Sequence, residues 1–336
     1  MLDDRKKKVL QAIVEEYINT AEPVSSGALT DTHGLNYSSA TIRNEMAELE
    51  KAGYLDKPHT SAGRVPSVQG YRLYVDELLK EDNISLDEIK YISQKLETKV
   101  NEIEELTQIA TTTISEITHY TTVSIGPRNE EQTIESVKFI LLNSRMLMAI
   151  IMTDSGLIKE TIIKYDEDVT ENQVETLNYM FNQKLKGKPL SKIDKTLEEY
   201  LNDELTYSVR VIKPIIDQIK KVLLEEDMDV HLEGTNKSFE LPEFKSLEIA
   251  KKFMNIIDEK ELMADMLNTG IAKDINVYIG DENEKEELKD FSVITFKHTV
   301  GGKDLGTIGI IGPKRMDYSK VISVMKYISK KLNENK

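Results

Sequence analysis

Residues 40–51 are the part of the sequence whose residue types and spacing best suit molecular recognition. At about 100° per residue, Ile42, Met46 and Leu49 fall on one side of a helix, which we expect to be buried. The other side is small and polar, and it carries Ala40, Asn44, Ala47, Glu48 and Lys51, flanked by Thr41 and Arg43. Small residues on this side would let a helix axis approach base edges in the major groove of duplex DNA.

Two side chains in this segment have donors and acceptors suited to bases. Asn44 could make a bidentate contact to adenine, and Arg43 could reach guanine or a phosphate. Taken alone, the same pattern is also typical of an ordinary solvated helix face. The elements around the segment therefore decide between the two interpretations.

A second polar group follows in a segment rich in turn-forming residues, 58–63. Residues 54–57 and 64–65 could pair as short strands on either side of it, which predicts a hairpin. Its side chains are of the kind that position a phosphate without reading sequence. They are Lys57, His59, Thr60, Ser61 and Arg64. A solvated loop is the alternative.

Three helices and this hairpin must position the two polar groups. Apolar periodicity predicts a first helix over 3–20 and a short second helix over 25–33. Ser38 or Ser39 can cap the third helix. Three helices followed by a two-stranded hairpin form a winged helix-turn-helix, which we predict for residues 1–80.

The rest of the chain mixes helical and strand-like segments, which predicts an α+β region. A capping box at 85–88 opens a long helix to about Ile117. Strand-like segments cover 136–143, 147–153, 157–164, 229–232, 275–279, 292–299 and 304–311, and helical ones cover 171–226, 246–268 and 318–332. We therefore predict an α+β domain over 85–165 and 229–336, led by the long helix, with a helical insertion over 166–228.

Composition limits the class of protein. The chain has 336 residues, 39% hydrophobic and 31% charged, as in soluble multidomain proteins. It has no cysteine, which excludes disulfides, thiol catalysis and cysteine-ligated zinc. Its longest apolar run, 146–152, is too short to cross a bilayer, and the N-terminus lacks a signal-peptide pattern, so we expect a cytoplasmic protein without a membrane partner.

Motifs of enzymes and cofactor sites are missing from the sequence. No HExxH, GxSxG, P-loop or EF-hand pattern occurs, so we expect no enzymatic activity, no cofactor and no metal site. The glycine-rich segment 306–312 lacks the order of a phosphate-binding loop. We interpret it as a strand that neighbouring backbone approaches closely.

Net charge is −15, which does not suit a DNA-binding protein at first sight. The charge is uneven, however. Residues 1–75 hold 9 Lys and Arg against 10 Asp and Glu, whereas the remaining residues hold 35 against 49. The acidity thus lies outside the N-terminal segment, and a local DNA-facing surface remains compatible with the sequence.

Several long motifs follow one another at 38–46, 49–55, 59–66 and 70–72, and later at 232–235, 279–283 and 309–318. In this order they resemble the heat-inducible transcription repressor HrcA family. The resemblance implies a winged-helix domain, a GAF-like α+β domain and a helical dimerising insertion. It also implies repression of chaperone operons at an inverted repeat known as CIRCE, with a chaperonin helping to keep the repressor active. Residues 23–27 lack the glycine and basic residue usual in the family.

The expected protein is a homodimer that binds double-stranded DNA at an inverted-repeat operator and releases it on heat stress. The DNA-binding residues we predict are Ser38, Ser39, Ala40, Thr41, Arg43, Asn44, Lys57, His59, Thr60, Ser61, Arg64 and Arg72. Three alternatives remain at this point. They are a regulator whose GAF-like domain senses a metabolite, a winged helix fused to an enzyme, and an interaction scaffold with a vestigial wing.

Overall fold

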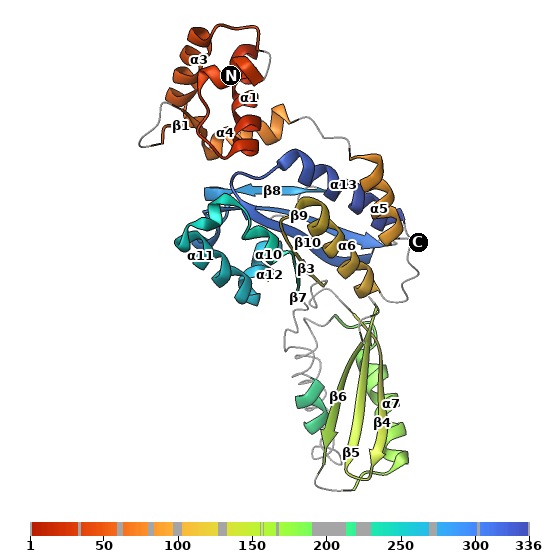
Figure 1. Ribbon diagram of the computed structural model, residues 1–336. Coiled ribbons are helices and arrows are strands. Elements are labelled where there is room, and N and C mark those ends of the chain that lie inside the picture. The colour runs from red at the N-terminus through yellow and green to blue at the C-terminus, as the bar shows by residue number, and fades with distance from the viewer. Residues whose placement is uncertain are drawn as a thin grey trace. The chain divides into compact units, whose positions relative to one another are not determined.

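The computed structural model describes most of the chain as two compact units, each considered by itself below (Figure 1). The described residues are 2–32, 35–58, 63–79, 84–96, 103–126, 133–154, 156, 158–165, 168–189, 213–219, 230–268, 274–300 and 303–334. Unit 1 comprises Met1–Ile125, Asp229–Gly301 and Thr307–Lys336. Unit 2 comprises Gly126–Met228 and Gly302–Gly306.

Unit 1 begins with three helices and a short hairpin, in the order that we predicted. The elements are α1 (Asp4–Thr20), α2 (Ser26–Thr32), α3 (Ser39–Lys51), β1 (Leu55–Asp56), β2 (Val65–Pro66) and α4 (Val68–Leu73), followed by one π-helical turn (Tyr74–Leu78). Strands β1 and β2 pair antiparallel. Val24 adds a further antiparallel bridge to Arg64, which joins the α1–α2 connection to the hairpin.

Side-chain caps fix where these helices begin. Asp3 accepts a hydrogen bond from Lys6 N at 2.9 Å, Ser38 from Thr41 N at 3.1 Å, and Ser67 from Gly70 N at 3.1 Å. Each cap satisfies an N–H that has no partner within the helix. Behind the caps, the apolar sides of α1, α2 and α3 form one core that includes Val9, Leu10, Ile13, Leu29, Ile42 and Leu49.

A five-stranded sheet forms the centre of the rest of unit 1. Its order is β7 (Val230–Glu233), β3 (Thr121–Ile125), β10 (Lys303–Pro313), β9 (Phe291–Val300) and β8 (Asn276–Ile279). Val123 of β3 stands opposite Gly309 on one side and Leu232 on the other, both in antiparallel pairs. Segments far apart in the sequence thus share one sheet.

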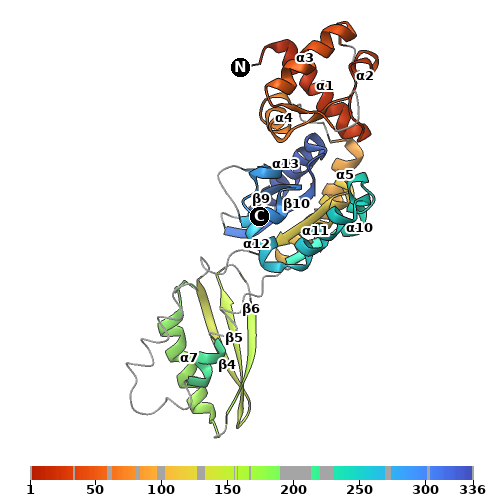
Figure 2. The ribbon, with the colours of Figure 1, turned by 90° about the vertical axis from the view of Figure 1, so that its left-hand side faces the viewer.

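Helices cover both faces of this sheet (Figure 2). The helices α5 (Leu86–Leu96), α6 (Ile103–Thr118) and α13 (Tyr318–Glu334) share a core with Ile308 and Ile310 of β10. The opposite face meets α10 (Thr235–Ser238), α11 (Leu247–Asp258) and α12 (Lys260–Asn268). The predicted long helix over 85–117 is described as two helices, α5 and α6, and residues 97–102 lie outside the described residues.

The glycine-rich segment 306–312 is a strand, as predicted, but a side chain rather than backbone approaches it most closely. A Cβ placed on Gly309 would lie 2.1 Å from Leu267 Cδ2 of α12. A Cβ on Gly312 would lie 2.6 Å from Met316 Cε. Gly309 therefore lets α12 pack directly against the sheet, and Gly312 leaves room for the Met316 side chain.

Unit 2 has its own antiparallel sheet, β4 (Ile134–Asn143), β5 (Met146–Thr153) and β6 (Ile158–Lys164), together with α7 (Glu171–Leu185). A helical segment over 213–219 contributes Ile215, Ile216 and Ile219 to the same core. We assigned these strands to the α+β domain and began the insertion at 166. The structure corrects that boundary, because the strands share a core with α7 and the unit begins at Gly126.

The helix α7 also closes one edge of this sheet. Asn178 accepts from Phe139 N at 2.7 Å and donates to Phe139 O at 3.1 Å. Asn182 makes the same pair of bonds with Val137, at 2.9 and 2.6 Å. These two amides take the place of a neighbouring strand at Val137 and Phe139, so the outer N–H and C=O groups of these two residues are satisfied.

Among the described residues, no helix combines the length and apolarity needed to cross a membrane. Within the same residues, no group of three or more His, Cys, Asp or Glu side chains has the arrangement of a metal site.

Replacing Gly70 with alanine should destabilise unit 1. A Cβ at Gly70 would lie 2.2 Å from the Tyr54 carbonyl oxygen, and a backbone atom in the hairpin base cannot move aside easily. We expect the free energy of unfolding to fall by about 1–3 kcal/mol, measured by urea denaturation. Gly27→Ala is the matched control, because its Cβ would meet only Ser25 Oγ, at 3.8 Å. Equal stability of the two variants would contradict this account.

Candidate nucleic-acid interface

The helix α3 presents the face that the sequence predicted. Ile42, Met46 and Leu49 are buried. The opposite side is exposed, and it consists of Ser39, Ala40, Arg43, Asn44, Ala47, Glu48 and Lys51. Ser38 is exposed as well, at the capping position. The orientation of the helix is thus confirmed, whereas contact of this face with DNA stays a prediction.

Two serines at the start of α3 have structural partners. Ser38 Oγ caps the helix and lies 2.9 Å from Thr41 Oγ1. Ser39 Oγ lies 2.9 Å from Ser26 Oγ, which links the first turns of α2 and α3. These bonds fix the angle at which the N-terminal end of α3 leaves the turn.

Basic residues of α1 form ion pairs with Glu45 and Glu48 of α3. Glu45 is buried and lies 3.4 Å from Arg5 Nη1 and 3.3 Å from Lys6 Nζ. Lys6 also lies 2.9 Å from a carboxylate oxygen of Glu48, and hydrogen bonds to Glu48 and Asp3 raise the pKa of Lys6. The negative charge of Glu48 on the exposed face is therefore partly offset, which lowers its repulsion of a phosphate.

The hairpin base is attached to α3. Arg64 donates through Nε to Glu50 at 2.7 Å and through Nη1 to its neighbour Gly63 O at 3.2 Å, with 18% of its side chain exposed. Lys57, directly after β1, is exposed. The predicted residues His59, Thr60 and Ser61 lie outside the described residues.

Arg72 has partners within unit 1. Its guanidinium bonds to both carboxylate oxygens of Glu282, at 2.7 Å from Nε to Oε1, and donates to Val277 O at 2.6 Å. Asp76 accepts from Nη1 at 3.3 Å. These contacts tie α4 to the end of β8, so the structure gives Arg72 a role that differs from the DNA contact we predicted.

A second arginine, which sequence reasoning missed, makes a similar connection. Arg315 bonds to Glu243 at 2.6 Å from Nε and donates to Ile18 O at the end of α1. Both Glu282 and Arg315 lie inside the motifs that carry the family resemblance, at 279–283 and 309–318. The motifs marked these positions, but no pattern in one sequence pairs residues so far apart in the chain.

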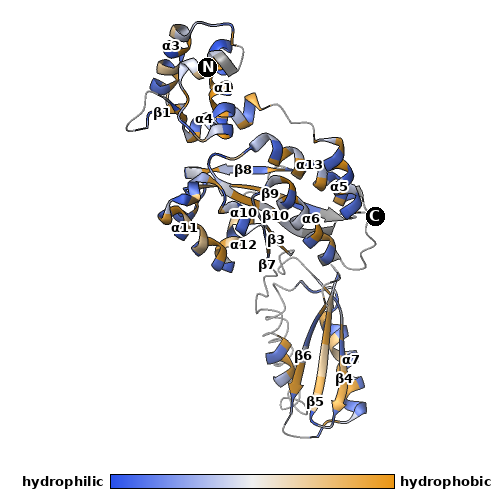
Figure 3. Ribbon diagram, viewed as in Figure 1, coloured by the Kyte–Doolittle hydropathy of each residue, from blue (hydrophilic) through white to orange (hydrophobic). Residues whose placement is uncertain are grey.

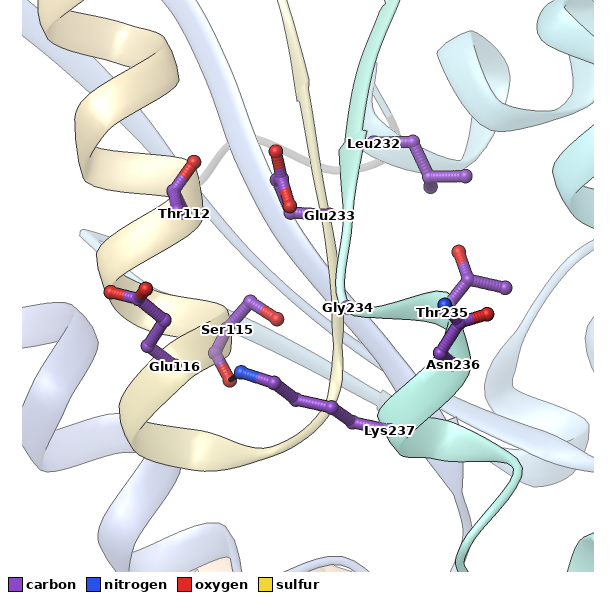
Figure 4. A pocket seen from close by; sticks show the side chains of 9 residues that line it. All are labelled: Thr112, Ser115, Glu116, Leu232, Glu233, Gly234, Thr235, Asn236 and Lys237. Carbon is purple, nitrogen blue, oxygen red and sulfur yellow. Dashed lines mark hydrogen bonds between the residues drawn. The ribbon is translucent and has the colours of Figure 1, made fainter.

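Unit 1 also contains a polar pocket between α6 and the β7–α10 connection (Figure 4). Its volume is about 450 Å³. The lining residues are Thr112, Ser115, Glu116, Leu232, Glu233, Gly234, Thr235, Asn236 and Lys237. The motif at 232–235 was the only sequence signal at this place.

Comparison with known proteins identifies transcription repressors as relatives. The heat-inducible transcription repressor HrcA of Ruminiclostridium cellulolyticum is 41% identical, over 99% of this chain and 97% of the relative. That of Acetivibrio thermocellus is 38% identical, over 99% and 96%. A crystal structure described only as a hypothetical protein shares the fold, with a TM-score of 0.62, 25% identity and coverage of 99% and 98%.

A model of the protein family confirms the relationship to these repressors. The HrcA protein C terminal domain matches residues 104–322. The chain belongs to the HrcA family.

Replacing Arg72 with alanine should lower stability. The change leaves Val277 O and a partly buried Glu282 without this partner, and we expect the free energy of unfolding to fall by about 1–3 kcal/mol. Thermal unfolding measures the effect, with Arg43→Ala as a control on an exposed arginine. Unchanged thermal stability together with loss of DNA affinity would instead support direct contact with DNA.

Proposed function

We propose that this chain is a heat-inducible transcription repressor that binds duplex DNA through its N-terminal region and has no enzymatic role. Residues 1–80 would act as a winged helix-turn-helix, and the five-stranded part of unit 1 as a GAF-like domain. The observation that carries the proposal is the exposed face of α3, which is small and polar over Ala40, Asn44 and Ala47. Its HrcA relatives are heat-inducible transcription repressors, which supports the same function.

Base reading is assigned to the exposed side of α3. Ala40 and Ala47 leave room for the helix axis to lie deep in the major groove. Asn44 would bond to adenine, and Arg43 to guanine or a phosphate. Ser38, Ser39 and Thr41 would contact DNA phosphates near the N-terminus of α3, where the backbone N–H groups of the helix favour binding of an anion.

We assign contact with the phosphate backbone of DNA to the hairpin. Lys57 is exposed, and it would bind a phosphate together with the predicted tip residues His59, Thr60 and Ser61. Arg64 would act mainly by holding the hairpin on α3 through Glu50, since its guanidinium is largely covered. Arg72 is left out of the proposed contact set because Glu282 and Val277 take its guanidinium.

An exposed apolar face of unit 2, whose strands β4–β6 are largely hydrophobic in Figure 3, supports a homodimer. The inner face of the sheet packs on α7, but the outer face carries large apolar side chains with no cover among the described residues. They include Ile140, Met152, Ile158 and Ile162, of which Ile158 is 59% exposed. A continuous apolar face of this kind is typical of a protein interface.

Charges on the same face suit a second copy of the chain. In the sheet register Lys138 stands opposite Ile150, and Ile150 opposite Glu160. A two-fold axis parallel to β5 would bring Lys138 of each copy over Glu160 of the other, with the isoleucines packed between the sheets. The homodimer would then present two copies of α3 to an inverted repeat of the CIRCE type.

Heat would relieve repression through the same interface. Dimer dissociation or partial unfolding removes the paired arrangement of the two α3 helices, so operator occupancy falls. A chaperonin that restores the folded dimer would act as a modulator, as the family resemblance implies. Such a repressor would work in the cytoplasm, where its operator is.

Asn44→Ala should weaken binding to the operator more than binding to random duplex. Loss of a bidentate base contact is expected to cost about 1–3 kcal/mol at the specific site, measured by fluorescence anisotropy on an inverted-repeat duplex and a shuffled one. Lys57→Ala is the comparison, since loss of a phosphate contact should weaken both duplexes alike and reduce the salt slope by about one. Equal losses for Asn44→Ala on both duplexes would rule out base reading.

The double variant Ile140→Asp with Ile162→Asp should be monomeric. Two buried carboxylates at an apolar interface cost far more than the contacts they replace. Analytical ultracentrifugation measures the mass in solution. Tyr179→Asp is the control, because Tyr179 is 66% exposed on α7, which covers the other face of the sheet.

The charge pair offers a reciprocal test of the same dimer. Lys138→Glu alone should raise the dimer dissociation constant, and adding Glu160→Lys should restore it. A dimer that survives both aspartate substitutions would place the interface elsewhere.

A further inference from the structure

The pocket between α6 and β7–α10 has the features of a ligand site. We propose that it binds a small zwitterion of the α-amino acid class, with one carboxylate and one ammonium group. Its volume of about 450 Å³ is within the range of small-molecule sites. The proposal goes beyond DNA binding, since none of the lining residues belongs to α3 or to the hairpin.

The strongest observation is a buried hydroxyl without a partner. Ser115 is 2% exposed, and its Oγ has no hydrogen bond to any described residue. Figure 4 shows this hydroxyl pointing from α6 toward Gly234. A buried hydroxyl left unpaired is unfavourable, so a bound polar group that pairs with it would be stabilised.

Gly234 allows this hydroxyl to lie directly beside the backbone of the pocket wall. Its φ of +78° is in the left-handed region, and a Cβ there would lie 1.9 Å from Ser115 Oγ. Any other residue at this position would both strain the backbone and displace the hydroxyl. The pocket therefore depends on a glycine at the point where β7 leads into α10.

Lys237 supplies a positive charge to the wall. Its ammonium donates to Ser115 O at 3.3 Å, and it forms no ion pair with any described carboxylate. A carbonyl oxygen does not neutralise the charge, so a ligand carboxylate at this end would gain a charge-assisted hydrogen bond. The Ser115 hydroxyl, which lies near the end of Lys237 in Figure 4, could add a further bond to the same group.

Glu233 supplies a negative charge, in a different environment from the other acid of the pocket. Glu116 already accepts from Tyr91 Oη at 2.5 Å and has Lys95 at 3.9 Å. Glu233 has only the imidazole of His231, at 3.3 Å, among its described ionisable neighbours. A ligand ammonium would therefore bind at Glu233 in preference to Glu116.

The opposite charges of Lys237 and Glu233 in the pocket wall favour a ligand that carries both charges. A simple anion bound at Lys237 would be repelled by Glu233, and a simple cation bound at Glu233 would be repelled by Lys237. A molecule that carries both charges satisfies both residues at once. Figure 4 shows Glu233 and the end of Lys237 on either side of Ser115, as such a ligand requires.

Isothermal titration calorimetry on the full chain tests the proposal. The probes are glycine, serine, leucine, lysine and glutamate, each titrated separately, with acetate and methylamine as ligands of single charge. At least one amino acid should bind once per chain, and tighter than either control. Lys237→Met and Glu233→Gln should each weaken that binding about tenfold or more, as expected for loss of a charge-assisted bond. Lys251→Met, on α11 outside the pocket, should leave it unchanged.

Ser115→Ala separates ligand binding from folding. Removal of an unpartnered buried hydroxyl should leave the melting temperature of the free protein unchanged or raise it, while the affinity for the amino acid falls. The proposal is wrong if no amino acid binds, if acetate or methylamine binds as tightly, or if Lys237→Met and Ser115→Ala bind the amino acid like the natural chain.

Discussion

Two arginine side chains join the N-terminal helices to the five-stranded sheet, and the rest of unit 1 depends on this connection. Arg72 reaches Glu282 and Val277 O from α4, and Arg315 reaches Ile18 O from beyond β10. Between them Tyr71 and Tyr318 pack at 5.7 Å between ring centroids. Because the buried residues of both parts form one cluster, the helices that would meet DNA share their stability with the sheet.

Several charged side chains around α3 are paired with one another. The basic residues Arg5 and Lys6 form ion pairs with Glu45 and Glu48, although about half of the Arg5 side chain stays exposed. The acidic excess of the remaining chain would repel phosphate in general, so affinity for DNA would rest on a few exposed groups such as Arg43 and Lys57. Because the dependence of affinity on salt scales with the number of phosphate contacts, binding of that kind would depend weakly on salt and mainly on correct placement of the helix.

Local structure was predictable from the sequence, and long-range pairing was not. Helical periodicity and capping residues fixed the buried side of α3, because Ile42, Met46 and Leu49 repeat at the helical spacing. Strand segments were also found, but period-two alternation says nothing about which sheet a strand joins. For that reason 134–164 were assigned to the wrong domain. Glu282 and Val277, which bond to Arg72, lie more than 100 residues from it in the chain, as Gly234 does from Ser115, and at such separations spacing carries no information.

The two asparagines of α7 have a consequence for a protein exposed to heat. A bare sheet edge can recruit a strand from another molecule and start a fibril. Asn178 and Asn182 occupy that edge on β4 with the pattern of bonds a recruited strand would use. As long as α7 stays folded, growth from this side is blocked. A repressor that heat has partly unfolded elsewhere could then refold and bind DNA again, instead of aggregating.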